Sequence, residues 1–266
     1  WWALGGLCVE NSGVDKGAIR ILFQLVVQSA ARDLFGRAQQ GGEIGIKASL
    51  FNGSVLADLT GFFYEFDDLQ VDFFNDAQFA FVTSNAGGSE TYGIELQADW
   101  ATPIEGLIVS GSFGWLESKF TDFDEFCYGG QTPADGCGPL QPGQTETDLR
   151  QNLAGNTRAG SPKYAAHLIA SYERPIGNNL LFGITSNVQW KDEQELSNSI
   201  PGVIQDAYAT VDANVRLATQ DGRWQLALIG KNLTDKQAFR GAGDVPETGG
   251  NTGTAEGFRG DYSGGV

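Results

Sequence analysis

The sequence predicts an all-β fold: an antiparallel up-and-down meander of roughly eight strands that forms a partial transmembrane β-barrel. Three observations support this fold class. Apolar and polar residues alternate with period two along most of residues 43–234, aromatic residues border the apolar face of several strands, and short and long connections alternate along the chain. A soluble sheet with one wet face explains the first observation, but only an outer-membrane barrel explains all three.

The clearest strand is predicted at residues 90–100. Successive side chains of a strand point to opposite faces, so one face of this strand carries Glu95, Gln97 and Asp99. The other face begins with Tyr92 and ends with Trp100, with aliphatic residues between them. Transmembrane strands place aromatic residues at the two water–lipid boundaries in this way.

The other strands are predicted from the same alternation. They are expected at residues 43–50, 55–74, 79–86 (continuing into 90–100), 107–120, 163–173, 180–191, 207–217 and 224–231. Asn52-Gly53 is a strong hairpin signal between the first two strands.

The connections predict two different rims. Those after residues 50, 100, 173 and 218 are short, those after residues 120, 191 and 235 are long, and the one near Asn75 is a brief exception. In a meander this alternation places the short turns at one rim and the long loops at the other, as in outer-membrane barrels. We expect one long external loop over residues 121–162.

Composition excludes several functional classes. The net charge is −16 and the pI is about 4.3, which argues against a nucleic-acid partner. The mean hydropathy is −0.21, and no apolar run reaches the length of about 18 residues that a transmembrane helix needs. The chain contains no Met, so we expect it to be a fragment.

Two regions are predicted. Residues 1–42 form an irregular or helical N-terminal segment, because residues 18–37 show a helix-like apolar spacing. Residues 43–266 form the partial barrel domain.

The three cysteines suggest a local disulfide. Cys127 and Cys137 flank a segment containing Gly and Pro, which favours a bond in an oxidising compartment and leaves Cys8 unpaired. Two free thiols or a partial metal site are the alternatives, although no His stands nearby.

Two sets of residues are assigned to the two faces of the barrel wall. The candidates for the lumen are Glu95, Gln97, Asp99, His167, Asp212, Asn214 and Arg216. They either contact a substrate or, as we favour, hydrate the interior and pack on a plug, and His167 is interpreted as a hydrogen-bonding residue rather than a metal ligand. The candidate membrane-boundary aromatics are Tyr92, Trp100, Tyr164, Tyr172, Trp190 and Trp224.

Other candidate sites have simple explanations. Asp122, Asp124, Glu125 and nearby Glu117 form an acidic cluster that fits a solvated loop better than a Ca²⁺ site, because the ligand spacing of a known site is missing. The sequence around Asn232 matches a glycosylation acceptor, but turn chemistry explains it better. No catalytic triad, phosphate-binding loop or dinucleotide motif is present, so we predict no enzyme and no cofactor.

Several segments resemble TonB-dependent outer-membrane receptors. They are residues 63–70, 86–96, 106–112, 156–163 and, most clearly, Trp224 to Gly230-Lys231-Asn232-Leu233-Thr234-Asp235. Together the resemblance covers about residues 43–240.

The resemblance implies a barrel of about 22 strands with a plugged lumen. Such a receptor, in the cell outer membrane of a Gram-negative bacterium, imports a scarce nutrient with energy from the inner membrane. The implied partners are outer-membrane lipid, a small nutrient ligand and the energy-transducing inner-membrane complex. Iron–siderophore, cobalamin and carbohydrate ligands all fit.

This chain departs from the family pattern. We expect the plug, the segment that binds the energy-transducing protein, more than half of the strands and a final strand within residues 257–266 to be missing. We therefore expect a C-terminal piece of the barrel, truncated at both ends. Two other functions compete with this one: a non-transporting outer-membrane barrel or adhesive scaffold, and a soluble carbohydrate-binding β-sandwich, which would bury its apolar faces between two sheets.

Overall fold

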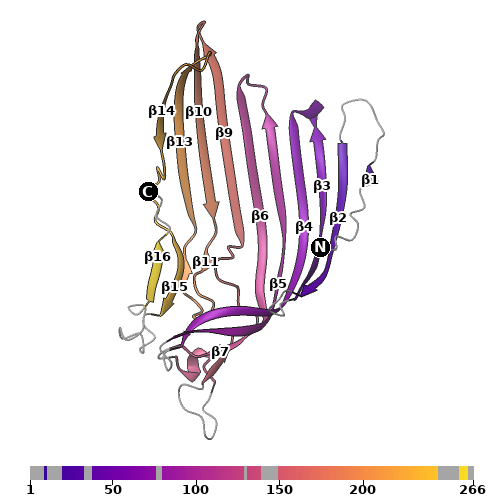
Figure 1. Ribbon diagram of the computed structural model, residues 1–266, viewed down its shortest axis with the longest axis vertical. Coiled ribbons are helices and arrows are strands. Elements are labelled where there is room, and N and C mark those ends of the chain that lie inside the picture. Colours follow the sequence, from indigo (N-terminus) through magenta and orange to yellow (C-terminus); the bar gives the residue numbers. More distant parts are fainter. Residues whose placement is uncertain are drawn as a thin grey trace.

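The main feature of the protein is a ten-stranded antiparallel sheet (Figure 1). The computed structural model describes the backbone of residues 9–10, 20–32, 38–75, 80–128, 131–138, 149–244 and 258–262, and the side chains at 39–69, 87–128, 131–138 and 149–242. The sheet contains β1 (Val9–Glu10), β2 (Arg20–Arg32), β3 (Ala38–Leu50), β4 (Val55–Asn75), β5 (Ala80–Ala101), β6 (Leu107–Asp122), β9 (Tyr164–Ile176), β10 (Leu180–Lys191), β13 (Tyr208–Thr219) and β14 (Gln225–Gly230).

The smaller elements belong to connections. Three two-stranded sheets pair β7 (Asp124–Phe126) with β8 (Arg150–Asn152), β11 (Gln194–Glu195) with β12 (Ile204–Gln205), and β15 (Phe239–Asp244) with β16 (Phe258–Tyr262). Two single-turn 3₁₀ helices are η1 (Phe51–Gly53) and η2 (Pro133–Asp135). Within the described residues the fold is therefore almost entirely β.

The predicted meander is confirmed. The eight predicted strands are β3, β4, β5, β6, β9, β10, β13 and β14, and each pairs with its neighbour in the order of the chain. Within the described residues the sheet is open: β1 stands at one edge and β14 at the other. β16 lies in the terminal region where the sequence predicted no strand, and it pairs with β15 outside the main sheet.

The helical prediction for part of residues 1–42 is wrong. Arg20–Arg32 forms β2, which pairs with β3 so that Phe23 is the register partner of Ile46. The alternation was hidden because Leu22 and Val26 stand at even positions, on the strand face that otherwise carries polar residues. β3 also begins at Ala38, so one continuous sheet crosses the predicted boundary at residue 42.

The short turns depend on glycine. In the β3–β4 hairpin, Asn52 and Gly53 adopt φ values of 59° and 87°, which fulfils the turn prediction. Between β5 and β6, Gly106 has φ 84°, and a Cβ there would collide with the backbone oxygen of Glu173. Only glycine fits such a position, so this turn can pack tightly against the end of β9.

The two ends of the sheet differ as the loop lengths predicted. The short turns lie at one end, whereas the β7–β8, β11–β12 and β15–β16 sheets gather at the other (Figure 1). The predicted exception near Asn75 arises because β4 and β5 are themselves extended and project past their neighbours at that end (Figure 1). The turn joining them, residues 76–79, lies outside the described residues.

Candidate functional site

The residues predicted to line a barrel lumen share one face of the main sheet. Residues that are in register on neighbouring strands point to the same side of a sheet. Gln97 and His167 are both in register with Ser112 of β6. Two positions along, Asp99 is aligned in the same way with Asp212, through the strands between them. The seven residues on this polar face are Glu95, Gln97, Asp99, His167, Asp212, Asn214 and Arg216. Their exposure to a lumen stays a prediction.

Side-chain pairs link strands across the polar face. Three of them join adjacent strands: Lys47 with Asp58 at 3.0 Å, His167 with Asn187 at 2.6 Å, and Ser171 with Thr185 at 3.2 Å. A fourth pair, Arg216 of β13 with Glu173 of β9, reaches across Gly183 of the intervening β10. His167 is thus a hydrogen-bonding partner within the sheet. Whether the lumen candidates contact a substrate or have the structural role that the sequence favoured stays a prediction.

The predicted boundary aromatics lie on the opposite, apolar face. Tyr92, Tyr164 and Trp190 stand toward the loop end, and Trp100 and Tyr172 toward the turn end. Trp224 lies in the turn immediately before β14, outside the register pairs. Tyr92 packs against Trp115 with ring centroids 6.0 Å apart, and Tyr164 stacks on Phe113 at 6.1 Å. Their position at a lipid boundary stays a prediction.

The apolar face is exposed. Between the aromatic rows, Ile44, Leu226 and Leu228 are 59%, 69% and 77% exposed. No second sheet covers this face within the described residues, which argues against the β-sandwich. Monomeric soluble proteins rarely expose so large an apolar patch, whereas lipid stabilises it.

The candidate functional site is the assembly of long loops at the other end of the sheet. We use "loop cap" for the described parts of residues 123–163, 192–207 and 236–244. No local sequence pattern indicates contacts among these segments, because each contact joins residues far apart in the chain.

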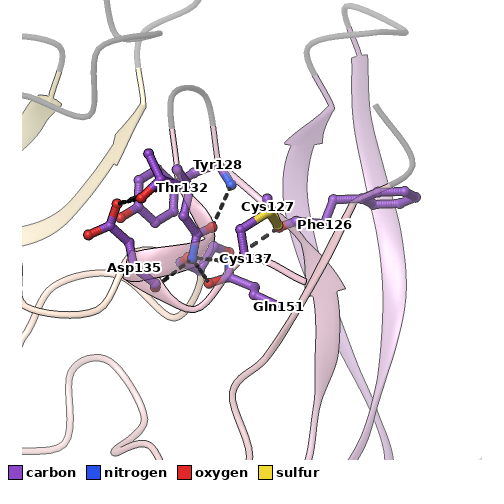
Figure 2. Close-up of a disulfide and its surroundings, with 9 residues drawn as sticks. Phe126, Cys127, Tyr128, Thr132, Asp135, Cys137 and Gln151 are labelled. Carbon is purple, nitrogen blue, oxygen red and sulfur yellow. Dashed lines mark hydrogen bonds between the residues drawn. A yellow bond between two sulfur atoms is a disulfide. The ribbon is translucent and has the colours of Figure 1, made fainter. Parts of the chain in front are cut away.

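The first loop is built around a disulfide. Cys127 and Cys137, the predicted pair, are bonded with Cα atoms 5.7 Å apart (Figure 2). Between them, Asp135 accepts hydrogen bonds from the Thr132 hydroxyl at 2.6 Å and the Thr132 backbone N–H at 3.2 Å. These bonds lower the pKa of Asp135 and close the η2 turn.

Gln151 connects the first two loops. Its side-chain amide donates to the backbone oxygens of Ser199, at 2.7 Å, and Phe126, at 3.2 Å. Gln131 in turn donates to the Gln151 side-chain oxygen at 3.0 Å. Because Gln151 is 3% exposed, these bonds fix the loops from within.

Further bonds make the loop cap one unit. The Ala159 backbone N–H donates to the Asn198 side chain at 2.7 Å, and the Gly160 N–H donates to Glu195 O at 2.9 Å. The third segment joins through the Ala242 N–H, which donates to Leu196 O at 3.0 Å. Burial raises the pKa of Glu195 here, against the opposing effect of the Gly202 N–H.

A small hydrophobic core anchors the loop cap to the sheet. Phe120 and Phe123 pack with ring centroids 4.5 Å apart, and together with Leu153 they are 0–2% exposed. Leu69 of the extended β4 packs against this cluster. The loop cap therefore has a defined position on the barrel wall.

A polar hollow of about 470 Å³ lies beside the β7–β8 hairpin. Its lining residues are Asp124, Gly136, Gly138, Arg150, Gln151 and Asn152. The Arg150 guanidinium lies 3.8 Å from the centre of the Phe126 ring. A Cβ on Gly138 would lie 2.9 Å from Arg150 O, so glycine permits the close backbone approach in which the Gly138 N–H donates to Arg150 O at 2.7 Å. The sequence did not identify Arg150 or Gln151.

The acidic cluster does not form a metal site in the described residues, where no group of three or more potential ligands comes together. Asp124 is exposed, whereas Glu125 points to the buried side of the hairpin. Glu117 pairs instead with Lys163 at 2.6 Å. The predicted turn role of Asn232 fits the structure, since its side chain bonds Lys236 N and O, both at 3.0 Å.

The family model that describes a TonB-dependent receptor-like β-barrel matches residues 40–233. The chain belongs to this family. The match covers the eight strands from β3 to β14 in the main sheet, and over these strands the predicted resemblance is confirmed.

Solved structures share the fold of this TonB-dependent receptor chain. FyuA, the ferric yersiniabactin uptake receptor of Yersinia pestis, has a TM-score of 0.60 at 14% identity, over 94% of this chain and 33% of its own. PiuA, a siderophore receptor of Acinetobacter baumannii, has 0.56 at 17% identity, over 97% and 33%. BauA, the ferric preacinetobactin receptor of the same species, has 0.54 at 15% identity, over 88% and 32%. The chain thus spans about a third of the length of each.

Two further findings are negative. No curated protein sequence matches this TonB-dependent receptor chain. None of its described helices has the length and hydropathy of a membrane span.

Proposed function

We propose that this chain forms wall strands and external loops of a ligand-gated importer in the outer membrane of a Gram-negative bacterium. The assembly of the loop cap carries the proposal, because it places a polar, rigidly bonded surface at one rim of a two-faced sheet. Loops held on a rigid scaffold are where proteins place binding residues. The sheet itself would contact outer-membrane lipid through its apolar face.

The proposed ligand class is an organic iron chelate. The receptors with the same fold bind such compounds according to their names, and this supports the class over cobalamin and carbohydrate. The polar hollow offers the Arg150 cation, which suits the anionic oxygens of such a chelate. Coupling to the energy-transducing inner-membrane complex would depend on parts of the receptor outside this chain.

The test is ligand binding and uptake by the full-length receptor. Cells that lack other iron-chelate receptors would express it, and labelled ferric chelates, cobalamin and oligosaccharides would be compared. We expect energy-dependent uptake of one chelate class, and Arg150→Ala should weaken its binding about tenfold or more. Asp221→Ala, at the short-turn rim, is the matched control and should leave binding unchanged. Binding without energy-dependent uptake would favour the non-transporting barrel, and uptake of another ligand class would overturn the chelate assignment.

A further inference from the structure

Glu125 is a buried carboxylate between two loops of the cap. It lies on β7, 1% exposed, on the side of the β7–β8 hairpin that faces residues 196–203. Within the described residues neither of its carboxylate oxygens has a partner in hydrogen-bond geometry. A buried carboxylate without such partners strongly prefers its neutral form.

The groups around Glu125 compensate its charge only in part. The Arg150 guanidinium on β8 is the charged group that acts on it, and the Ser199 hydroxyl approaches from the second loop. Asp124, next in the chain, is exposed and points to the opposite face of the hairpin. The contact therefore buries one acid with little to balance its ionised form.

The same contact holds the two loops together. Glu125 is the register partner of Gln151, whose side chain donates to Ser199 O at 2.7 Å. The backbone N–H groups of Ala159 and Gly160, which follow β8 in the chain, donate to Asn198 and Glu195 of the second loop. A charge buried at Glu125 acts directly on this interface.

We propose that Glu125 is a proton-controlled latch of the loop cap: when protonated it favours the closed contact between the β7–β8 hairpin and residues 196–203, and when ionised it favours separation. This goes beyond the proposed function, since it requires no particular ligand. A receptor that binds at its external loops would thereby respond to the pH outside the cell.

The direction of the pH dependence follows from linkage. Burial raises the pKa of Glu125 to about 6 in the closed cap, against the smaller lowering effects of Ser199 and Arg150. The ordinary value is 4.5. A raised pKa gives stability that is fully present below the ordinary value and is lost as the pH rises through the raised one. The difference corresponds to about 30-fold in the closing equilibrium.

Amide hydrogen exchange on the full-length receptor tests the latch. Between pH 4 and pH 8, after correction for intrinsic exchange, protection of Ala159 and Gly160 should fall by up to about 30-fold. Amides of β9 and β10 should keep constant protection. A constant protection of Ala159 and Gly160 would overturn the proposal.

Three variants make the test specific. Glu125→Gln has the same shape and no charge, so its protection should not change with pH, whereas Asp124→Asn should keep the wild-type profile. Ser199→Ala removes a group that lowers the pKa of Glu125, so its transition should move to higher pH. That variant decides the question if Glu125→Gln fails to fold. An unchanged transition in both Glu125→Gln and Ser199→Ala contradicts the latch.

Discussion

The imidazole Nε2 of His167 lies 2.6 Å from the Asn187 side-chain oxygen, diagonally across β9 and β10. The register partners of the two residues are Gln189 and Ile169, so the bond spans two positions of the ladder. It is the side-chain link that ties the single histidine of the chain to the polar face.

A double-mutant cycle should detect this bond. His167→Ala and Asn187→Ala should each lower the free energy of unfolding, and their coupling energy should be about 0.5–1.5 kcal/mol, as for a typical hydrogen bond. Urea unfolding of the full-length receptor in lipid would measure it. The cycle of His167→Ala with Gln189→Ala is the control and should show coupling near zero. Equal coupling in both cycles would refute a specific bond.

Gly93 should be intolerant of a side chain. A Cβ there would collide with Trp115 O and stand 2.9 Å from the Phe62 ring, so β5 and β6 would have to separate. We expect Gly93→Ala to cost about 1–3 kcal/mol of unfolding free energy. A Cβ on Gly114, on the same polar face, would meet no described atom within 4 Å, and Gly114→Ala should change stability by less than about 0.5 kcal/mol. Similar urea midpoints for the two variants would contradict this interpretation.

Local patterns predicted most of the sheet because each face of the wall meets a different medium. Tyr92 and Trp100 point to one face of β5, and Glu95 and Gln97 point to the other. This contrast determines the register without any distant contact. β2 was missed because its apolar residues fall on both parities. The loop cap was not predictable, since the contact of Gln151 with Ser199 joins residues 48 positions apart and leaves no periodic signal.

The disulfide should stabilise only the loop cap. Cys127 and Cys137 are 10 residues apart, and a loop of this length gives about 3 kcal/mol of local stabilisation in the chain-entropy model. The variant with both cysteines changed to Ala should be cleaved faster by protease within residues 127–137, while the urea midpoint of the main sheet stays unchanged. Cys8→Ala is the control and should resist cleavage like the wild type. An equal loss of stability in the main sheet would show that the disulfide supports the whole wall.

Two adjacent positions can test which face of the sheet meets lipid. Leu96 lies on the apolar face and is 42% exposed, and Gln97 is the next residue, on the polar face. A lysine near the middle of a lipid-facing strand costs about 2–4 kcal/mol, whereas one on the inner face is tolerated. Leu96→Lys should therefore lower the folded fraction of the full-length receptor in lipid vesicles, and Gln97→Lys should not. The folded fraction can be followed by resistance to protease and by unfolding in urea. If Gln97→Lys proves the more damaging variant, the assignment of the two faces is reversed, and the lumen candidates, His167 included, would face lipid.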